Sequence, residues 1–524
     1  MTESKLNAIA SLIGKALHIW AVQYHFVIPR EILKMYIDKF THERRNIARY
    51  GCRFFDPHDG EQYRKWLSFR TSALDPSKKR NDITAVAENA LLDLSAVHTE
   101  YALIVSEGCQ LYPGYASVLP EEGDVIYFDH DRTDDAGQRF EPVLKPDFSY
   151  NTLRSFNYIG RCFAVKTELL RQFEGEPWNP YRWVLQLSDQ TKKITHVSEI
   201  VYADQKSFAC EAETLREYLS QSNTRAAVRV NADQISCTVE YETQGNPLIS
   251  IIIPTKDGLD VLRTCVDSIF RKTVWPRYEI IIADNNSEKQ ETLDYFRALK
   301  EAHDNVQVVR VDAPFNFSYI NNRAAEYANG EYFVLLNNDT EVISPDWLDQ
   351  MAGYAQRYNV GTVGVKLYYE DGTIQHGGVI IGKGGAAAHR WYRCEKDVRD
   401  YLFTLSAPND VGCVTAACMM TSRKCWQEMN GLNEELAVQY NDVDYGLRLL
   451  KAGYFNVFLP SVELYHYESK SRGIDTDRKA VKRFFEEVNW FKEHYAAYII
   501  HDPFYNDGFD KSYDYMLIAS SGRN

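Results

Sequence analysis

Short apolar runs that alternate with stretches of helical spacing dominate residues 248–336. The runs cover 248–253, 279–283, 306–311 and 332–336. Near-continuous runs of Ile, Val and Leu are typical of strands buried on both faces of a parallel sheet. The segments between them are predicted as helices at about 258–271, 288–301 and 318–328. This alternation predicts an α/β fold with a mostly parallel sheet.

The chain is long enough for several domains, and turn-rich segments divide it. It has 524 residues, whereas a domain typically has about 100–200. Turn clusters at 75–82 and 243–247 provide boundaries. Before 248, short strands at 101–105 and 125–128 and a helix at 167–173 indicate another α/β layer. We therefore predict a helical N-terminal region (1–82), an α/β unit (83–245), a second α/β unit (246–475), and a C-terminal helix with a tail (476–524).

The two α/β units share short sequence similarities. They occur in the same order in both units: 87–105 resembles 321–336, 160–175 resembles 415–431, and 200–202 resembles 463–465. Three similarities in one order favour a duplicated unit, although each is short.

Composition narrows the class of protein. The formal net charge is −14, which disfavours binding to nucleic acid, because that needs clustered positive charge. The ten cysteines show no CxxC spacing and indicate reduced thiols in a cytosolic protein. We expect no signal peptide, because Lys15 and His18 interrupt the apolar stretch 6–22, and no apolar run is long enough to span a bilayer.

Polar residues follow two of the predicted strands. Asn337, Asn338 and Asp339 follow the run 332–336, and 284–287 follow the run 279–283. Ligands bind outside the carboxyl ends of strands in α/β sheets, so Asp339 could hold a cation beside a diphosphate, and Asp284 could accept hydrogen bonds from a base or ribose. Turn formation and helix capping explain the same residues equally well.

A second acidic cluster, 441–444, opens a predicted helix. Asp442 and Asp444 lie two positions apart and cannot share one helical face, so one could point into a cleft while the other does a different task. Carboxylates also favour helix N-termini in general. His466 could complete a cation site, although a lone histidine is more often structural. No P-loop pattern occurs.

Four motifs in 248–475 resemble a family 2 glycosyltransferase domain of the GT-A type, a Rossmann-like fold of nucleotide-diphospho-sugar transferases. They are 250–257, 282–287, 336–339 and 440–448, in the family's order. Four further segments resemble bacterial polysaccharide and O-antigen glycosyltransferases with two such units in tandem. These are 313–318, 372–378, 466–473 and 502–506.

The resemblance implies a role for individual residues. Nucleotide-sugar binding falls to Pro254, Thr255, Asp257, Asp284, Asn322, Arg323 and Asn338. Asp339 and His466 would bind Mn²⁺ or Mg²⁺, and Asp442 would be the catalytic base. Contacts to acceptor or donor sugar are expected from His376, His389, Trp391 and Asp444, with Trp391 as a stacking surface.

The implied activity is that of a metal-dependent, inverting hexosyl- or rhamnosyltransferase. The donor would be a UDP- or dTDP-linked sugar. The acceptor would be a saccharide or a polyprenyl-diphosphate-linked saccharide in bacterial surface polysaccharide, O-antigen or lipopolysaccharide synthesis. We expect a cytoplasmic protein that can associate peripherally with the inner face of the cell membrane. The alternative is a non-catalytic glycan-binding or scaffolding protein built from pseudo-enzyme units. A nucleotidyltransferase lacks support, because no triphosphate loop rich in glycine and arginine lies near the first strand.

The first unit departs from the pattern. It has Val-Ser-Glu-Gly at 105–108 where the second has Leu-Asn-Asn-Asp, and Asn-Pro-Tyr-Arg-Trp at 179–183 replaces the acidic helix start. Asp129-His130-Asp131 spells D-x-D but follows the expected metal position, which disfavours a metal role. We therefore expect a non-catalytic unit that braces the second unit or helps to hold acceptor.

Overall fold

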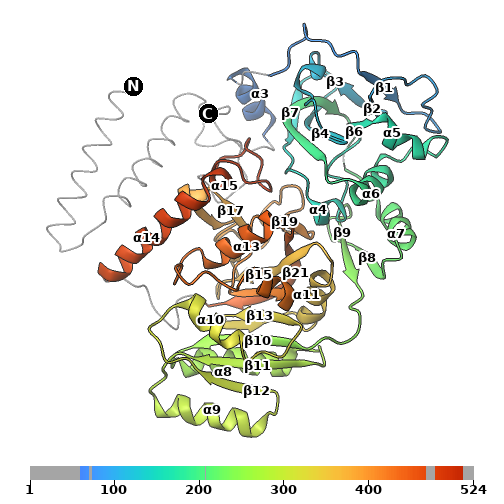
Figure 1. Cartoon of the computed structure of the whole chain (residues 1–524). Helices are drawn as coiled ribbons and strands as arrows, with labels where there is room; N and C mark the ends of the chain where they lie inside the picture. The colour runs from blue at the N-terminus through green and yellow to red at the C-terminus, as the bar shows by residue number, and fades with distance from the viewer. Residues whose placement is uncertain (1–58, 70–72, 207, 468–477, 512–524) are drawn as a thin grey trace, which may run out of the picture.

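The computed structural model describes residues 59–69, 73–206, 208–467 and 478–511 (Figure 1). Most of the predicted N-terminal helical region, the motif residues 468–473 and the end of the predicted tail lie outside these residues. The described part of the N-terminal region contains helix α3 (Gly60–Phe69). Among the described helices, none is both long and apolar enough to cross a membrane.

Every strand and helix predicted between 248 and 336 is confirmed. They are β10 (Ile249–Thr255), α8 (Leu259–Lys272), β11 (Tyr278–Asp284), α9 (Gln290–Ala302), β12 (Val306–Arg310), α10 (Phe317–Ala325) and β13 (Tyr332–Leu336). The strands pair in parallel in the order β12-β11-β10-β13. The side chains of β10, β11 and β13 are mostly buried on both faces, which explains their continuous apolar runs, whereas the edge strand β12 is partly exposed.

The same sheet continues beyond β13 with mixed strand directions. The order is β13, β20 (Cys418–Ser422), β15 (Val360–Tyr368), β21 (Phe455–His466) and β14 (Thr340–Val342), with β16 (Ile374–His376) and β19 (Asn409–Val411) at its margins. Only β15 and β21 are parallel in this half. We call the whole the second sheet. Helices α8, α9 and α11 (Trp347–Ala355) cover one face, and α10, α12 (Arg423–Glu428) and α13 (Asn441–Lys451) cover the other.

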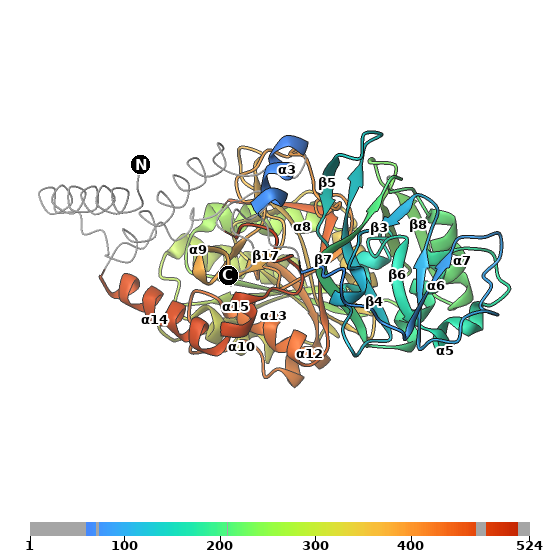
Figure 2. The ribbon, with the colours of Figure 1, turned by 90° about the horizontal axis from the view of Figure 1, so that it is seen from above.

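The first sheet lies beside the second (Figures 1 and 2). Its strands are β1 (Ile83–Ala87), β2 (Tyr101–Val105), β6 (Cys162–Lys166), β4 (Val125–Thr133), β7 (Ile194–Asp204) and β3 (Cys109–Leu111), in that spatial order, with β5 (Arg139–Val143) paired to β4. Helices α6 (Pro180–Gln190) and α7 (Ala212–Gln221) pack on one face together with the hairpin of β8 (Ala226–Val230) and β9 (Cys237–Tyr241). The predicted helix 167–173 is a short α5 (Thr167–Leu170) followed by a 3₁₀ turn.

The two sheets share their connectivity. The order β1-β2-β6-β4-β7-β3 matches β10-β13-β20-β15-β21-β14, and each pair of neighbours has the same relative direction. This shared strand order is what the duplication of an α/β unit would produce. In the described part of the first unit, no strand corresponds to β11 or β12. The similarity of 87–90 to 321–324 is misleading, because the former ends strand β1 and the latter lies in helix α10.

Buried contacts join the two units. The Tyr401 hydroxyl donates to the carbonyl oxygen of Pro142 at 2.7 Å and accepts from the backbone N–H of Leu144 at 2.9 Å. The carboxylate of Asp410 accepts from the backbone N–H of Asn151 at 2.9 Å. An apolar cluster formed by both units and α3 surrounds Tyr401. These contacts hold the sheets in one arrangement.

The predicted charged C-terminal helix is confirmed as α14 (Arg478–His494), which is followed by α15 (Ala496–Ile500). Phe491 and Tyr495 pack against Val443 and Leu447 of α13. The C-terminal helices therefore buttress the helix that begins with the acidic cluster.

Candidate active site

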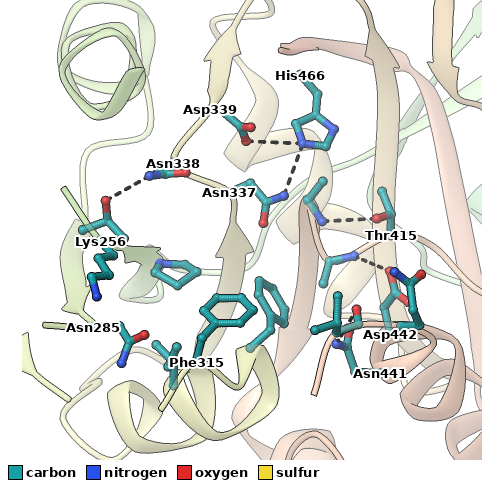
Figure 3. A pocket seen from close by; sticks show the side chains of 18 of the residues that line it. Lys256, Asn285, Phe315, Asn337, Asn338, Asp339, Thr415, Asn441, Asp442 and His466 are labelled. Atoms are coloured by element: carbon teal, nitrogen blue, oxygen red, sulfur yellow. Dashed lines mark hydrogen bonds and ion pairs between the residues drawn. The ribbon is translucent and has the colours of Figure 1, made fainter. Parts of the chain in front are cut away.

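A cavity of about 550 Å³ lies at the carboxyl ends of β10 and β13 (Figure 3). We call it the second-sheet cavity. Its polar lining comes from segments far apart in the chain, namely Thr255, Lys256, Asn285, Asn337, Asn338, Asp339, Gln375, His389, Thr415, Gln439, Asn441, Asp442 and His466. Strand ends, the start of α13 and the end of β21 thus converge on one hollow, as expected for a ligand site in an α/β sheet.

Asp339 and His466 meet at one edge of this cavity. Strand β14 starts directly after Asp339, and its first residue, Thr340, pairs with His466 at the end of β21. His466 Nε2 lies 3.3 Å from Asp339 Oδ1 and 3.2 Å from the side-chain nitrogen of Asn337. Both Asp339 and His466 are buried, and His466 Nδ1 has no hydrogen-bond partner among the described residues. The pairing of two strands therefore brings together the two predicted metal ligands.

The donor set of this pair fits a divalent cation. Carboxylate oxygen and neutral imidazole nitrogen are ligands that Mn²⁺ accepts, and Mg²⁺ is usually bound through one or two carboxylates plus substrate phosphates and waters. Neighbouring ligands of an octahedral ion, each at about 2.1 Å, lie about 3 Å apart, which is compatible with the 3.3 Å between Asp339 and His466. Among the described residues, no group of three or more His, Cys, Asp or Glu side chains could hold a metal. Asp339 and His466 would need a ligand or water to complete the shell.

Asp442 lies in the first turn of α13, across the cavity from Asp339 (Figure 3). Its Oδ2 accepts from the backbone N–H of Ala416 at 3.0 Å, and its Oδ1 accepts from that of Val443 at 2.8 Å. Burial raises the pKa of the Asp442 carboxyl above its ordinary value, and the backbone N–H groups of Ala416 and Val443 partly oppose this. A carboxylate that is both oriented and made more basic is suited to accept a proton.

The opposite wall comes from the end of β10 and the loop after β13. Pro254 and Thr255 both line the cavity. The side-chain N–H of Asn338 donates to Thr255 Oγ1 at 2.9 Å, which ties the two segments together. Among the described lining residues, Lys256 is the one Lys or Arg, and its side chain is exposed. Lys256 therefore offers the positive charge that an anionic ligand would meet.

Two carboxylates predicted to contact the nucleotide lie outside the lining. Asp284 accepts from the backbone N–H of Ser287 at 2.8 Å and from Arg310 at 2.6 Å. Asp257 accepts from the backbone N–H of Lys289 at 3.0 Å. Both carboxylates stabilise the turn that carries Asn285 and are not directed into the hollow. For Asp284, the capping role that the sequence left open describes its contact with Ser287.

Asn322 and Arg323 on α10 also lie away from the lining. The amide group of Asn322 donates to the carbonyl oxygen of Leu432 and accepts from its N–H, both at 2.9 Å. Arg323 pairs with Glu326 on its own helix at 2.7 Å. Asn322 fixes the chain that leads toward α13, so its contact with the site is indirect.

Of the four predicted sugar contacts, only His389 lines the cavity. His376 is fully buried behind it, with its Nδ1 2.9 Å from His389 Nδ1, and burial lowers its pKa well below the ordinary value. Asp444 accepts from the hydroxyl of Tyr495 at 2.6 Å, so it faces the junction between α14 and α15 while Asp442 faces the cavity. This confirms that the two carboxylates point different ways.

Trp391 was expected as a stacking surface, but it does not reach the cavity. Its side chain is 2% exposed and donates its indole N–H to Thr404 Oγ1 at 3.2 Å. It packs in the apolar cluster between the units. Trp391 therefore belongs to the core between the units.

Several lining residues were not singled out from the sequence. Phe315 and Phe317 lie in the quoted motif 313–318, so a signal for them existed. Val438 and Gln439 carried no signal. Their backbone N–H groups donate to the carboxylate of Glu487 on α14, and the neighbouring residues in the sequence do not indicate this contact.

The literal D-x-D of the first unit is a buried hydrogen-bonding element. The Asp129 carboxylate accepts from the backbone N–H of Lys145 at 2.8 Å and from Asn506 at 3.1 Å. The Asp131 carboxylate accepts from the hydroxyls of Tyr63 and Tyr112, both at 2.7 Å. These contacts anchor α3 and the chain end to the first sheet, in agreement with the prediction that a metal role is disfavoured.

Comparison with known proteins identifies the second unit. The model of the family "Glycosyl transferase family 2" matches residues 250–425. A Sinorhizobium fredii protein named y4gI is 36% identical over 410 residues, which are 74% of this chain and 45% of that protein. The O-antigen biosynthesis protein RfbC of Myxococcus xanthus is 35% identical over 410 residues, or 73% of this chain and 31% of that protein.

A more distant relative has a named reaction. The N-acetylglucosaminyl-diphospho-decaprenol L-rhamnosyltransferase of Mycobacterium tuberculosis is 24% identical over 215 residues, which cover 37% of this chain and 68% of that enzyme. The chain spans less than half the length of the first two relatives. The family match covers β10, β13 and β14 at the second-sheet cavity, whereas the lining residues Asp442 and His466 lie beyond it. The described strands of the second unit therefore include a segment, residues 250–425, that matches the model of glycosyl transferase family 2.

Proposed function

We propose that this chain is a metal-dependent, inverting glycosyltransferase that moves a sugar from a nucleoside-diphosphate donor to a saccharide acceptor. One observation carries the proposal. The Asp339–His466 pair and the Asp442 carboxylate line one cavity from opposite sides (Figure 3). Transfer of this kind needs charge stabilisation at the leaving group and a base at the nucleophile, and the cavity offers candidates for both.

The chemistry assigns one task to each side. The acceptor hydroxyl oxygen forms a bond to the anomeric carbon while its proton passes to Asp442. The bond from that carbon to the diphosphate oxygen breaks, and the electron pair leaves with the nucleoside diphosphate. Asp339 and His466 would hold Mn²⁺ or Mg²⁺, which supplies positive charge where the leaving group gathers negative charge. Attack from the face opposite the leaving group inverts the anomeric centre.

The names of two relatives support the choice of acceptor. One is an O-antigen biosynthesis protein, and the other acts on a decaprenyl-diphosphate-linked sugar, as its name states. We therefore propose a surface polysaccharide or its polyprenyl-diphosphate-linked precursor as acceptor, and a UDP- or dTDP-linked sugar as donor. Such an acceptor would place the reaction at the inner face of the cell membrane.

A nucleotide-sugar screen tests the proposal. UDP- and dTDP-sugars are incubated with the full chain, with Mn²⁺ or with a chelator, and release of nucleoside diphosphate is measured with and without a polyprenyl-diphosphate-linked saccharide. We expect release that requires the cation and rises with acceptor. Absence of release from every donor would contradict the proposal and, if saccharides still bind, would favour the glycan-binding alternative. The configuration of the product, read by NMR, tests inversion separately.

A further inference from the structure

A second cavity, of about 730 Å³, lies beside the first sheet. We call it the first-sheet cavity. Strands β4, β5 and β7, helix α6 and the segment 399–406 of the second unit contribute to its wall. No step of the proposed transfer uses this cavity.

The two cavities occupy corresponding places in the two sheets. Tyr181 is the second residue of α6 and lines the first-sheet cavity, as Asp442 is the second residue of α13 and lines the second-sheet cavity. Asp204 pairs with the first residue of β3, as His466 pairs with the first residue of β14. Asp204 and His466 line their respective cavities. The first unit has therefore kept the hollow at the place where the second unit has its site.

The groups needed for transfer have not been kept there. Gly108, directly before β3, stands where Asp339 stands before β14. Tyr181 is buried, and its hydroxyl donates to the carbonyl oxygen of Leu153 at 2.7 Å. The described part of the first unit also lacks counterparts of β11 and β12, which build the nucleotide side of the second sheet. The first-sheet cavity therefore has room for a ligand but no carboxylate at the places of Asp339 and Asp442, and the Asp204 carboxylate at the place of His466 pairs with Arg161.

The charges around this cavity do not favour an anion. Arg132 pairs with Glu141 at 2.8 Å, and Arg161 pairs with the Asp204 carboxylate. Lys206 pairs with a glutamate at 2.9 Å. A phosphate would have to compete with these carboxylates for the positive side chains, so the charges around the cavity favour an uncharged ligand.

Polar atoms capable of binding hydroxyl groups do face this cavity. His130 is 5% exposed, and no described residue forms a hydrogen bond with its Nδ1. Burial lowers the pKa of His130 well below its ordinary value, so the imidazole is neutral. Burial raises the pKa of Glu211 to about 7, and its one hydrogen bond here, from Asn157, is long at 3.4 Å. A buried polar atom without a partner is costly, and a ligand hydroxyl would satisfy it.

Aromatic side chains complete the wall. Phe208 from the first unit and Phe403 from the second lie edge to face, with ring centroids 6.2 Å apart. The rings of Phe208 and Phe403 offer apolar surface beside the polar atoms of His130 and Glu211. Apolar faces rimmed by hydroxyl groups are the chemistry of a sugar ring, and a pocket of this kind is the usual form of a small-ligand site.

We propose that the first-sheet cavity binds an uncharged saccharide unit. Taken with the proposed function, on which this part rests, that unit belongs to the acceptor glycan, held by the first unit while the second unit extends it. Phe403 and Ser406 come from the second unit, so a glycan in this cavity contacts both units at once.

Saccharide binding can be measured without donor or cation. Methyl glycosides of glucose, N-acetylglucosamine and rhamnose are added to the full chain, and saturation-transfer NMR measures their binding, with inorganic phosphate as a competitor. Two variants change the cavity in different ways: Glu211→Ala removes a polar group, and Ala209→Trp fills the space from an exposed position. Glu213→Ala, on the exposed face of α7, is the matched control. Melting temperatures confirm that each variant is folded.

We expect at least one glycoside to bind, both cavity variants to weaken its binding at least about tenfold, and Glu213→Ala and phosphate to have no effect. Unchanged binding in folded Ala209→Trp, displacement by phosphate, or no binding of any glycoside would overturn the proposal. Donor hydrolysis distinguishes this result from the proposed function. Ala209→Trp should raise the KM for acceptor and leave cation-dependent hydrolysis of donor unchanged. If glycoside binding is lost in this variant but even the wild-type chain hydrolyses no donor, the cavity assignment stands and the proposed transfer fails.

Discussion

His466 Nε2 lies 3.3 Å from Asp339 Oδ1 because the short strand β14, which begins right after Asp339, runs antiparallel to the end of β21. The pair is buried at the edge of the second-sheet cavity, and within the described part of the chain the second ring nitrogen of His466 has no hydrogen-bond partner. One register thus decides whether the two candidate metal ligands meet. In the first sheet the same register brings Asp204 to the place of His466, but Gly108 replaces Asp339.

Substitution of either member of this pair should weaken the use of the cation. In Asp339→Asn and His466→Gln, we expect the Mn²⁺ concentration for half-maximal nucleoside-diphosphate release to rise at least about tenfold, because a ligand is lost or weakened. The measurement is a metal titration of donor hydrolysis. The control is His98→Gln at an exposed position. An unchanged titration curve in both variants would place the cation elsewhere.

The sequence predicted the strands well because burial on both faces leaves a continuous apolar run, as in β10 and β11. Asp339, His466 and Asp442 were predicted from their motifs, and the structure brings them to one cavity. Asp284 and Trp391 carry the expected residue types, but their contacts are to Arg310 and Thr404. Such contacts depend on the packing of distant segments, which a motif does not encode.

Loss of the carboxylate at Asp442 should remove the base. We expect Asp442→Asn to lower kcat for transfer by about 10²–10⁴-fold and to leave donor affinity within about twofold, because the amide cannot accept the proton. Asp304→Asn, an exposed aspartate before β12, is the matched control. Single-turnover kinetics and donor titration separate the two effects. Transfer at the normal rate in Asp442→Asn would remove this residue from the role.

The pH profile should report the same group. Burial raises the pKa of Asp442, and the base acts only when it has lost its proton. Activity should therefore rise with pH through this raised pKa, and the acidic limb of kcat/KM should lie above the usual aspartate range near 3.9. The measurement is kcat/KM against pH at saturating Mn²⁺. A limb at or below the ordinary aspartate pKa would contradict the assignment.

The cavity wall at 437–439 should depend on Glu487 of α14. The buried Glu487 carboxylate accepts from the backbone N–H groups of Ala437, Val438 and Gln439 at 2.9, 3.2 and 2.8 Å. Glu487→Gln replaces one acceptor oxygen by a donor, so at least one of these N–H groups loses its partner. We expect KM to rise several-fold with a smaller change in kcat. Glu486→Gln, exposed and on the same helix, should behave as the wild type. Equal kinetics in both variants would show that α14 does not set this wall.

The contact between the units should contribute measurably to stability through Tyr401. Its hydroxyl forms hydrogen bonds with the carbonyl oxygen of Pro142 and the backbone N–H of Leu144 in the first unit. Tyr401→Phe would leave both backbone groups buried without this partner. We expect a loss of about 2 kcal/mol in the free energy of unfolding, measured by urea denaturation. Tyr392→Phe is the control, because the hydroxyl of Tyr392 has only a 3.4 Å contact with Arg393. If the units unfold separately in Tyr401→Phe, the transition should become biphasic. A change within about 0.5 kcal/mol would mean that water satisfies these groups or that the units are held by the apolar cluster alone.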